Sequence, residues 1–381
     1  MSVIITTADS IKALVIVRSL GRKGIKITSG DKRKFALASL SKYSTGSFIY
    51  PSPLSEPEAF ISSLVHFVKY NKHDVLISTH SEDTHLIAKH KSDLEPYVKV
   101  PLHDYSQLIK AHDKGYIMQV AQELGMPIPK TSFIRDLDEL YRVMEEISFP
   151  AVVKLRTGTS STGISFAHTR EELITRFKAT VSHFNLAPED YPLVQEYIPG
   201  DGYGVSLLFN HGELRARFTH RRIREYPPSG GPSSYRISTE HPEMEEIAIK
   251  LLKYFHWHGV AMVEFKLNNR NNKPVLLEVN PRFWGSLNQA ICCNVDFPYL
   301  LYRMAVDGDV KPVLTYKFGV KTRVLFIDYV TLLKQLHSSS HRLSTFKEFF
   351  HSYPDDIISF TDLLPTLGFL YGQLRSRLGS T

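Results

Sequence analysis

Two glutamates, each at the end of an apolar run, constrain the fold of this chain more than any other feature. Glu264 follows the apolar residues 260–263, and Glu278 follows the apolar residues 275–277. The stretch 268–273 between them is polar and rich in asparagine. Two apolar runs joined by a short polar connection predict two strands of a hairpin, with the carboxylates on neighbouring strands.

Neighbouring carboxylates in buried strands need a cation or another partner, because burying them alone is costly. Asn280 and Arg282 come shortly after Glu278. Carboxylate and amide oxygens are hard ligands that suit Mg²⁺ or Mn²⁺ carried on a nucleotide phosphate, and a guanidinium can clamp phosphate oxygens. We therefore predict that Glu264, Glu278 and Asn280 hold a metal, with the arginine beside them. The alternative is a hairpin whose acids face solvent.

The first hundred residues alternate apolar strands with helical stripes, which predicts an α/β fold with a parallel sheet. The expected strands cover 3–5, 25–27 and 75–77. The expected helices cover 11–20 and 59–68, and a third begins at 86. The polar loop 78–83 lies at the carboxyl end of a strand, where such sheets bind ligands, and it fits a helix cap equally well. Residues 6–9 after the first strand contain no glycine. A dinucleotide cofactor is therefore not expected.

A lysine ends the next apolar strand, 149–154, and a loop of small residues, 155–163, follows it. Small residues let backbone N–H groups approach phosphates, and hydroxyls add donors. A lysine at the end of a buried strand needs an anion. The alternative is a flexible hairpin whose lysine reaches water. The predicted phosphate-binding residues are Lys154, Gly158, Thr159, Ser160, Ser161 and Gly163.

Taken together, these motifs resemble those of ATP-grasp enzymes and follow the same order. Lys114, at the head of a helix before the turn 125–131, resembles the first ATP-contacting lysine, although it would otherwise read as a surface lysine. Residues 193–200 resemble the hinge whose groups contact adenine and ribose. The resemblance implies nucleotide contacts from Gln195, Glu196, Tyr197, Ile198 and Asp201.

The resemblance also implies a domain organisation. We expect a Rossmann-like domain over 1–103 and an α+β ATP-grasp domain over 104–310, with a C-terminal extension of one strand, 320–327, and helices over 311–381. Within the ATP-grasp domain, a lid subdomain would span about 131–198 and a metal-binding subdomain about 199–310.

Arginines cluster within residues 215–224, before a Pro-Pro-Ser-Gly-Gly turn, and alternation predicts a strand with arginines on one face. So many cations need anions nearby, and we expect Arg221, Arg222 and Arg282 to act in catalysis. The alternative is a solvated basic strand or a nucleic-acid patch. The segment is similar to one in a branch of carboxylate–amine (or carboxylate–thiol) ligases, related to the large chain of carbamoyl-phosphate synthetase and to biotin carboxylase.

The function implied by the resemblance is an ATP-dependent ligase using ATP and Mg²⁺ or Mn²⁺. It would activate a small-molecule carboxylate as an acyl phosphate and join it to an amine. The alternatives are an ATP-grasp kinase and a non-catalytic nucleotide-binding regulatory protein. A homodimer is expected, because dimers are common among relatives.

Composition narrows the classes of partner. The net charge of +7 suits an anionic ligand, but the excess is mostly dispersed, so a nucleic-acid partner is not expected. No apolar run approaches the ~20 residues of a membrane span, and the N-terminus lacks signal-peptide features. Cys292 and Cys293 are adjacent, which rules out an ordinary disulfide between them. We therefore expect a cytoplasmic protein.

Overall fold

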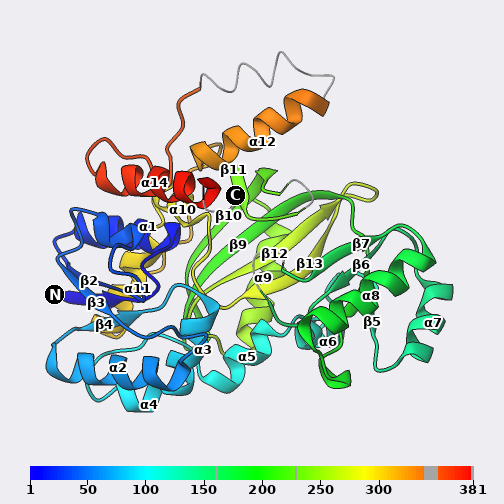
Figure 1. Cartoon of the computed structure of the whole chain (residues 1–381), viewed down its shortest axis with the longest axis horizontal. Helices are drawn as coiled ribbons and strands as arrows, with labels where there is room; N and C mark the ends of the chain where they lie inside the picture. The colour runs from blue at the N-terminus through cyan, green and yellow to red at the C-terminus, as the bar shows by residue number, and fades with distance from the viewer. Residues whose placement is uncertain (159–161, 228–229, 339–350, 379–381) are drawn as a thin grey trace.

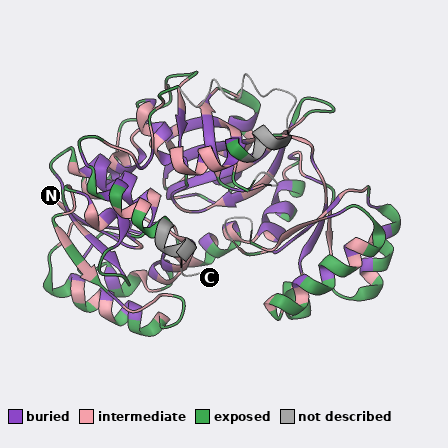
Figure 2. Cartoon of the chain, turned by 45° about the horizontal axis from the view of Figure 1, so that its top comes forward, coloured by how far each residue is buried: buried purple, intermediate pink, exposed green. Residues whose placement is uncertain are grey.

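Three β-sheets form the framework of the protein. The computed structural model describes residues 1–158, 162–227, 230–338 and 351–378. Figure 1 shows the N-terminal sheet on the left, a large central sheet and a small sheet on the right. Figure 2 shows that the buried residues run through the strands of the central sheet.

The N-terminal sheet is parallel throughout, which confirms the predicted α/β fold. Its strand order is β3-β2-β1-β4. The strands are β1 (Ser2–Ile5), β2 (Lys26–Asp31), β3 (Gly46–Ile49) and β4 (Val75–Ile77). The connecting helices are α1 (Ile11–Gly21), η1 (Leu37–Leu40), α2 (Pro57–Tyr70), α3 (Ser81–Lys89) and α4 (Lys91–Leu94).

Helix α3 begins earlier than predicted. It starts at Ser81 rather than near residue 86. The reason is local, because the Asp83 carboxylate accepts the backbone N–H of His80 at 2.9 Å and so completes a cap at the helix start.

The small sheet is antiparallel and has the order β5-β8-β6-β7. Its strands are β5 (Thr131–Phe133), β6 (Ala151–Lys154), β7 (Ile164–Ala167) and β8 (Leu193–Glu196). The associated helices are α7 (Leu137–Glu146), α8 (Arg170–Phe184) and η2 (Pro188–Asp190). Leu140 of α7 and Phe177 of α8 pack with Val153 in one apolar cluster.

The large sheet has the order β13-β12-β9-β10-β11-β14, and neighbouring strands are antiparallel. Its strands are β9 (Gly200–Asn210), β10 (Glu213–Glu225), β11 (Ser233–Ser238), β12 (Gly259–Asn268), β13 (Lys273–Asn280) and β14 (Lys321–Arg323). The helices around it are α5 (Tyr105–His112), α6 (Lys114–Glu123), α9 (Pro242–Tyr254), α10 (Leu287–Cys292) and α11 (Phe297–Asp307).

Side-chain alternation divides the large sheet into two buried faces. Val263 and Phe265 of β12 pack in a cluster that contains Ile117 of α6 and Leu251 of α9. Met262 points to the opposite face, whose cluster contains residues of α1, α10 and α11. Glu264 shares this second face with Met262, so the carboxylate projects toward the side that carries the N-terminal domain.

The C-terminal tail returns to both the large sheet and the N-terminal domain (Figure 1). Strand β14 ends at Arg323, and helix α12 (Leu325–Ser338) follows, so the predicted strand 320–327 was too long. The Asp355 carboxylate accepts the backbone N–H of Leu325 at 2.6 Å, and this distant contact helps to start the helix. Helix α14 (Leu364–Leu378) lies beside η1 of the N-terminal domain. The predicted boundaries after 103 and 310 stay predictions.

Among the residues that the structure describes, no helix is long and apolar enough to cross a membrane.

Candidate active site

The two glutamates face each other on the predicted hairpin. Strands β12 and β13 are antiparallel, and Glu264 is the direct register partner of Glu278. The side chains are only 16% and 20% exposed, which contradicts the alternative in which both acids face solvent. The hairpin prediction is confirmed, and it leaves two mostly buried carboxylates that need partners.

Cations from three other elements neutralise these carboxylates. Arg222 of β10 approaches Glu264 at 2.5 Å between Nη2 and Oε2. The Nζ atoms of Lys154 and Lys114 lie 3.2 and 3.5 Å from Oε2 of Glu278. Because Lys154 ends a strand of the small sheet, Glu278 lies where the small and large sheets meet.

The cations set the protonation of the acids. Burial acts to raise the pKa of Glu278, but Lys154 and Lys114 outweigh it and hold that pKa below the usual value. Burial raises the pKa of Glu264, with Arg222 opposing and Glu278 adding to the effect. Burial also lowers the pKa of Lys114, although Glu278 opposes the shift. The site therefore holds an ionised Glu278 next to a second carboxyl that takes up a proton more readily.

Asn280 and Arg282 extend the site toward the N-terminal domain. Asn280 donates from Nδ2 to Glu264 Oε1 at 2.8 Å and accepts at Oδ1 from Arg282 Nη2 at 3.0 Å. Arg282 Nε donates to Ser81 Oγ at 3.0 Å, and Ser81 begins α3. The loop 78–83 thus caps its helix, as one reading predicted, and it also contacts this arginine; its role in ligand binding stays a prediction.

A cavity of about 570 Å³ lies between the small and large sheets and is bordered by these groups. Its wall includes apolar side chains from both sheets, among them Val152, Ile164, Phe166 and Leu277. The predicted site residues that line it are Lys114, Lys154, Gly158, Gln195, Glu196, Tyr197, Ile198, Arg222, Glu264 and Glu278.

Other predicted residues lie elsewhere. Asp201 and Arg221 pair with each other at 2.8 Å, and their side chains are 55% and 41% exposed. Gly163 has a φ of +71° and accepts the backbone N–H of Leu155 at 3.2 Å, which closes the base of the loop that was predicted to bind phosphate. The predicted Thr159, Ser160 and Ser161 lie outside the described residues. The roles of these residues stay predictions.

Two charged residues that line the cavity were not predicted from the sequence. Lys266 lies two positions after Glu264 on β12, so strand alternation places it on the same face, and that signal could have identified it. Glu225 ends β10 and accepts from Arg222 Nη1 at 3.1 Å. Arg222 therefore contacts two carboxylates, Glu225 and Glu264, and this orients its guanidinium across the cavity edge.

The donor set fits a hard divalent cation that arrives with phosphate groups. Mg²⁺ is usually bound by one or two carboxylates together with substrate phosphates and water, rather than by a full protein cage. Glu264, Glu278 and the Asn280 amide supply that kind of partial set. No cluster of three or more His, Cys, Asp or Glu side chains suited to a metal occurs in the described part of the chain.

Two family models match this part of the chain. One, described as ATP-grasp in the biosynthetic pathway with Ter operon, matches residues 189–325. The other, described as the ATP binding domain of the carbamoyl-phosphate synthase L chain, matches residues 113–199.

Curated relatives share part of the chain. A ribosomal protein bS6–L-glutamate ligase from Shigella boydii is 30% identical over 47% of this chain and 59% of its own length. The carbamoyl phosphate synthase large chain of Myxococcus xanthus is 21% identical over 70% of this chain and 25% of its own length. The chain therefore spans less than two thirds of either relative.

Solved structures show the same fold. A biotin carboxylase from Campylobacter jejuni in complex with β,γ-ATP has a TM-score of 0.69 at 16% identity, covering 84% of this chain and 74% of that one. An L-amino acid ligase from Bacillus licheniformis has a TM-score of 0.62 at 17% identity, covering 82% and 77%. Both family models fall on the residues that build the cavity, and the chain is related to the ATP-grasp superfamily.

Proposed function

We propose that this protein is an ATP-dependent ligase that activates a substrate carboxylate as an acyl phosphate and joins it to an amine, releasing ADP and phosphate. The observation that carries the proposal is the pair Glu264 and Glu278, held at the edge of a cavity by lysines from outside the hairpin. The relatives support a ligase, since they include a bS6–L-glutamate ligase, a D-alanine–D-alanine ligase and an L-amino acid ligase.

The cavity suits a nucleotide because its lining is apolar on one part and charged on another. Val152, Ile164 and Phe166 of the small sheet offer an apolar surface for a flat ring, beside the segment 195–198 with its backbone groups. Lys114 and Lys154 lie at the charged part. We infer that ATP lies with its base among the apolar residues and its phosphates toward the lysines.

Glu264, Glu278 and Asn280 would hold Mg²⁺. Bound there, the ion would supply positive charge that favours phosphoryl transfer. Lys114 and Lys154 now pair with Glu278, and they would exchange part of that contact for phosphate oxygens. Arg222 and Arg282 flank the carboxylates and would stabilise negative charge on the transferred group. Arg221 would also stabilise negative charge on the transferred group, from a greater distance than Arg222 and Arg282.

The test is calorimetric titration of ATP with and without Mg²⁺, repeated with Mn²⁺. We expect binding that needs the divalent ion and is weakened by Glu278→Gln and by Lys154→Met. Lys130→Met is the matched control, because Lys130 is a half-exposed lysine that pairs with Glu146 and does not line the cavity. Binding that ignores both site substitutions, or that Lys130→Met weakens equally, would refute the assignment.

Product analysis separates a ligase from a kinase. The protein with MgATP, pooled carboxylates and pooled amines should release ADP and phosphate and form an amide, whereas a kinase would leave a phosphorylated product. The biotin carboxylase domain of the Hydrogenobacter thermophilus 2-oxoglutarate carboxylase, a related structure, is a dimer, and a homodimer is likewise our proposal for this chain. Sedimentation equilibrium tests it directly.

A further inference from the structure

Lys12 is a mostly buried lysine to which the ligase chemistry above gives no role. It lies in the first turn of α1, directly after the loop that follows β1, and is 9% exposed. Within the ranges that the structure describes, no hydrogen bond, ion pair or ring contact is made by its ammonium group. An ammonium group in such a position is unfavourable unless an anion joins it.

The position of Lys12 in the sheet indicates a binding crevice. In the order β3-β2-β1-β4, strands β2 and β3 are added on one side of β1. Strand β4 then pairs with the other side of β1, so the direction of strand addition reverses at β1. Ligands of open parallel sheets bind outside the carboxyl ends of the strands at such a reversal. Helix α1 follows β1 and α3 follows β4, so Lys12 and Ser81 lie in the first turns of the two helices that border this crevice.

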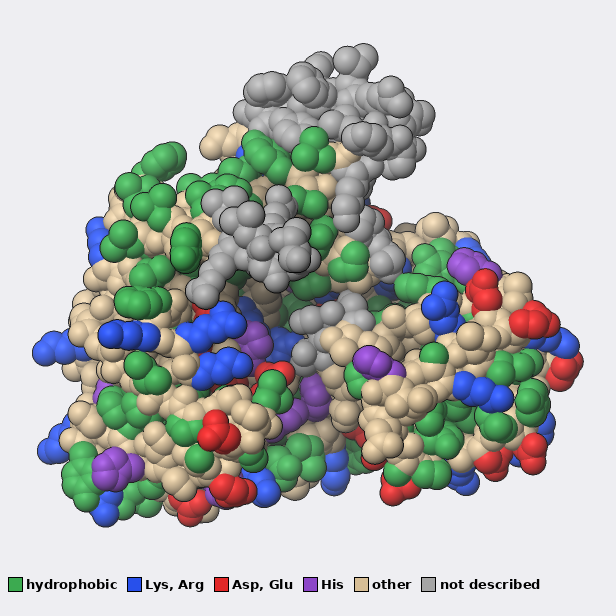
Figure 3. Space-filling view, in the orientation of Figure 1, with side chains coloured by type: hydrophobic (Ala, Val, Ile, Leu, Met, Phe, Trp, Pro, Cys, Tyr) green, Lys and Arg blue, Asp and Glu red, His purple; other side chains and the backbone are tan. Residues whose placement is uncertain are grey.

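The crevice connects directly to the carboxylate pair. Arg282 bridges the two, since it donates to Ser81 on one side and to Asn280 on the other. Asn280 in turn contacts Glu264. Figure 3 shows histidine, basic and acidic side chains gathered in the hollow between the two sides of this face.

Neither of the two acids that the structure describes near Lys12 forms an ion pair with its ammonium group. Asp83 is fully buried and already accepts from the Thr6 and Thr7 hydroxyls at 2.5 and 2.8 Å, as well as from backbone N–H groups. Glu82 is the other acid beside the lysine, and it is partly exposed.

The pKa shifts of Lys12 and His80 agree with a site that accepts an anion. Burial, then Arg282, lowers the pKa of Lys12. Burial, then Lys12 and Arg282, lowers the pKa of His80 to about 3, so His80 is a neutral group at the crevice at physiological pH. An anion beside Lys12 would favour its charged form and take up a proton.

We propose that this crevice binds a second anionic group of the acid substrate through Lys12, while the reacting carboxylate lies beyond Arg282 near Glu264 and Glu278. The substrate class is therefore an acid with two anionic groups, such as a dicarboxylate or a phosphorylated acid. The proposal rests on the ligase function above, and it adds Lys12 as a specificity-determining residue.

Charge-selective labelling tests the crevice without any turnover. Pyridoxal 5′-phosphate and pyridoxal carry the same aldehyde, but only the first is strongly anionic, and both form borohydride-trappable adducts with lysine amines. Lys89 is the control position, because it is an exposed lysine at the end of α3. We expect the ratio of phosphate-bearing to phosphate-free label, measured by peptide mass spectrometry, to be roughly tenfold or more higher at Lys12 than at Lys89. Equal ratios, or no labelling of Lys12 by either reagent, would overturn the proposal.

Substrate preference gives the second test. ADP release is measured with acids paired with near-isosteric partners that lack the second charge, for example L-glutamate with L-glutamine and succinate with butyrate. The wild-type protein should prefer the dianionic members, Lys12→Met should lose that preference, and Lys89→Met should keep it. Equal use of both members by the wild type contradicts the substrate class. If no acid supports ADP release, the ligase function fails, and the labelling result alone decides the crevice.

Discussion

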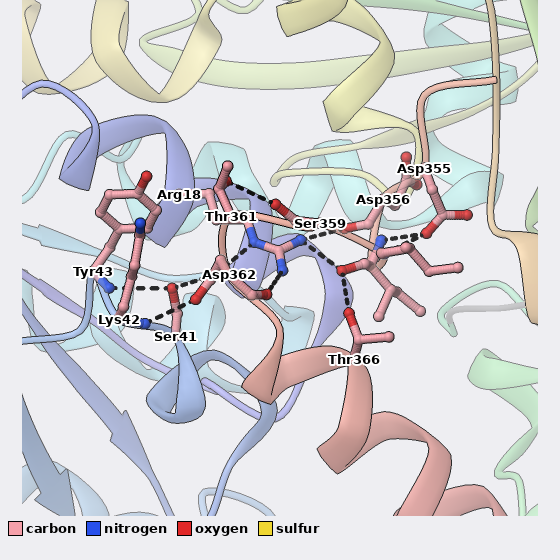
Figure 4. A network of polar contacts seen from close by, with 12 residues as sticks. Arg18, Ser41, Lys42, Tyr43, Asp355, Asp356, Ser359, Thr361, Asp362 and Thr366 are labelled. Atoms are coloured by element: carbon pink, nitrogen blue, oxygen red, sulfur yellow. Dashed lines mark hydrogen bonds and ion pairs between the residues drawn. The ribbon is translucent and has the colours of Figure 1, made fainter. Parts of the chain in front are cut away.

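Replacing Asp362 with alanine should destabilise the protein strongly, because this carboxylate joins the C-terminal tail to the N-terminal domain. Asp362 Oδ2 accepts from Arg18 Nε at 2.8 Å and from Ser41 Oγ at 2.7 Å, while Oδ1 accepts from the Lys42 N–H at 2.9 Å. The side chains of Arg18 and Asp362 are 6% and 1% exposed. Figure 4 shows these groups converging between α1 and the segment before α14.

The expected cost follows from the geometry. Removing one partner of a buried ion pair leaves the other charge uncompensated, which costs about 3–5 kcal/mol. Arg18 keeps its bonds to the carbonyls of Ile357 and Asp362, at 2.8 and 3.0 Å, and these place the expected loss toward the lower end of the range. The loss should therefore be about 3 kcal/mol in the free energy of unfolding.

Urea unfolding followed by circular dichroism measures this loss. Thr361→Ala is the control, because Thr361 is the exposed neighbour in the chain. The double variant Arg18→Met with Asp362→Ala should lose less than the sum of the two single losses, because it leaves no unpaired charge. A loss below about 1 kcal/mol, the range of a surface ion pair, would refute the reasoning.

The same residue predicts a pH dependence. Burial acts to raise the pKa of Asp362, but the hydrogen bonds from Arg18, Lys42 and Ser41 outweigh it and lower the pKa. A lowered folded-state pKa stabilises the protein above the unfolded value of about 3.9 and loses that stabilisation as pH falls through the folded value. The difference in stability between wild type and Asp362→Ala should therefore shrink when unfolding is repeated at acidic pH.

Three further predictions concern other parts of the fold. Gly204→Ala should cost about 1–3 kcal/mol in urea unfolding, because a Cβ there would lie 2.5 Å from Cε1 of His220; an unchanged midpoint would contradict this. Burial, then three neighbouring basic groups, lowers the pKa of His112 to about 3, so the wild type should lose stability as pH falls from 6.5. His112→Asn should reduce that slope by up to about 1.4 kcal/mol per pH unit, and an unaltered slope would count against the assignment. Arg224→Lys should lose the two-pronged contact with Asp328, both bonds being 2.8 Å, and cost about 1.5–3 kcal/mol in thermal or urea unfolding.

Local pattern was enough to predict the elements that carry the site. The hairpin of β12 and β13, the parallel N-terminal sheet and the strand ending at Lys154 each show as an apolar run bounded by polar residues. Such runs can be read from the sequence because burial of one strand or helix requires apolar residues at neighbouring positions of the chain. The pairing of Glu264 with Glu278 followed from the short connection between their strands.

The ends of some helices and strands depended on hydrogen bonds from polar side chains, which the pattern of apolar residues does not predict. Helix α3 begins five residues before residue 86 because Asp83 caps it, a signal present in the sequence but ambiguous there. Strand β14 gives way to α12 at a position that a distant carboxylate, Asp355, helps to set. Contacts between residues 30 positions apart leave no periodic trace.

The sequence alone therefore determined which residues could carry charge into a buried site, and the tertiary structure decided which of them meet. Arg222, Lys114 and Lys154 arrive at the two glutamates from β10, α6 and β6, and nothing in their local sequence specifies the partner. Local sequence likewise does not specify the contact between Arg282 and Ser81. It does not specify the burial of Lys12 beside β1 either, which depends on the order of the strands. The physical reason is that the energy of a charge depends on the groups and solvent around it, and those are supplied by chain segments far apart in sequence.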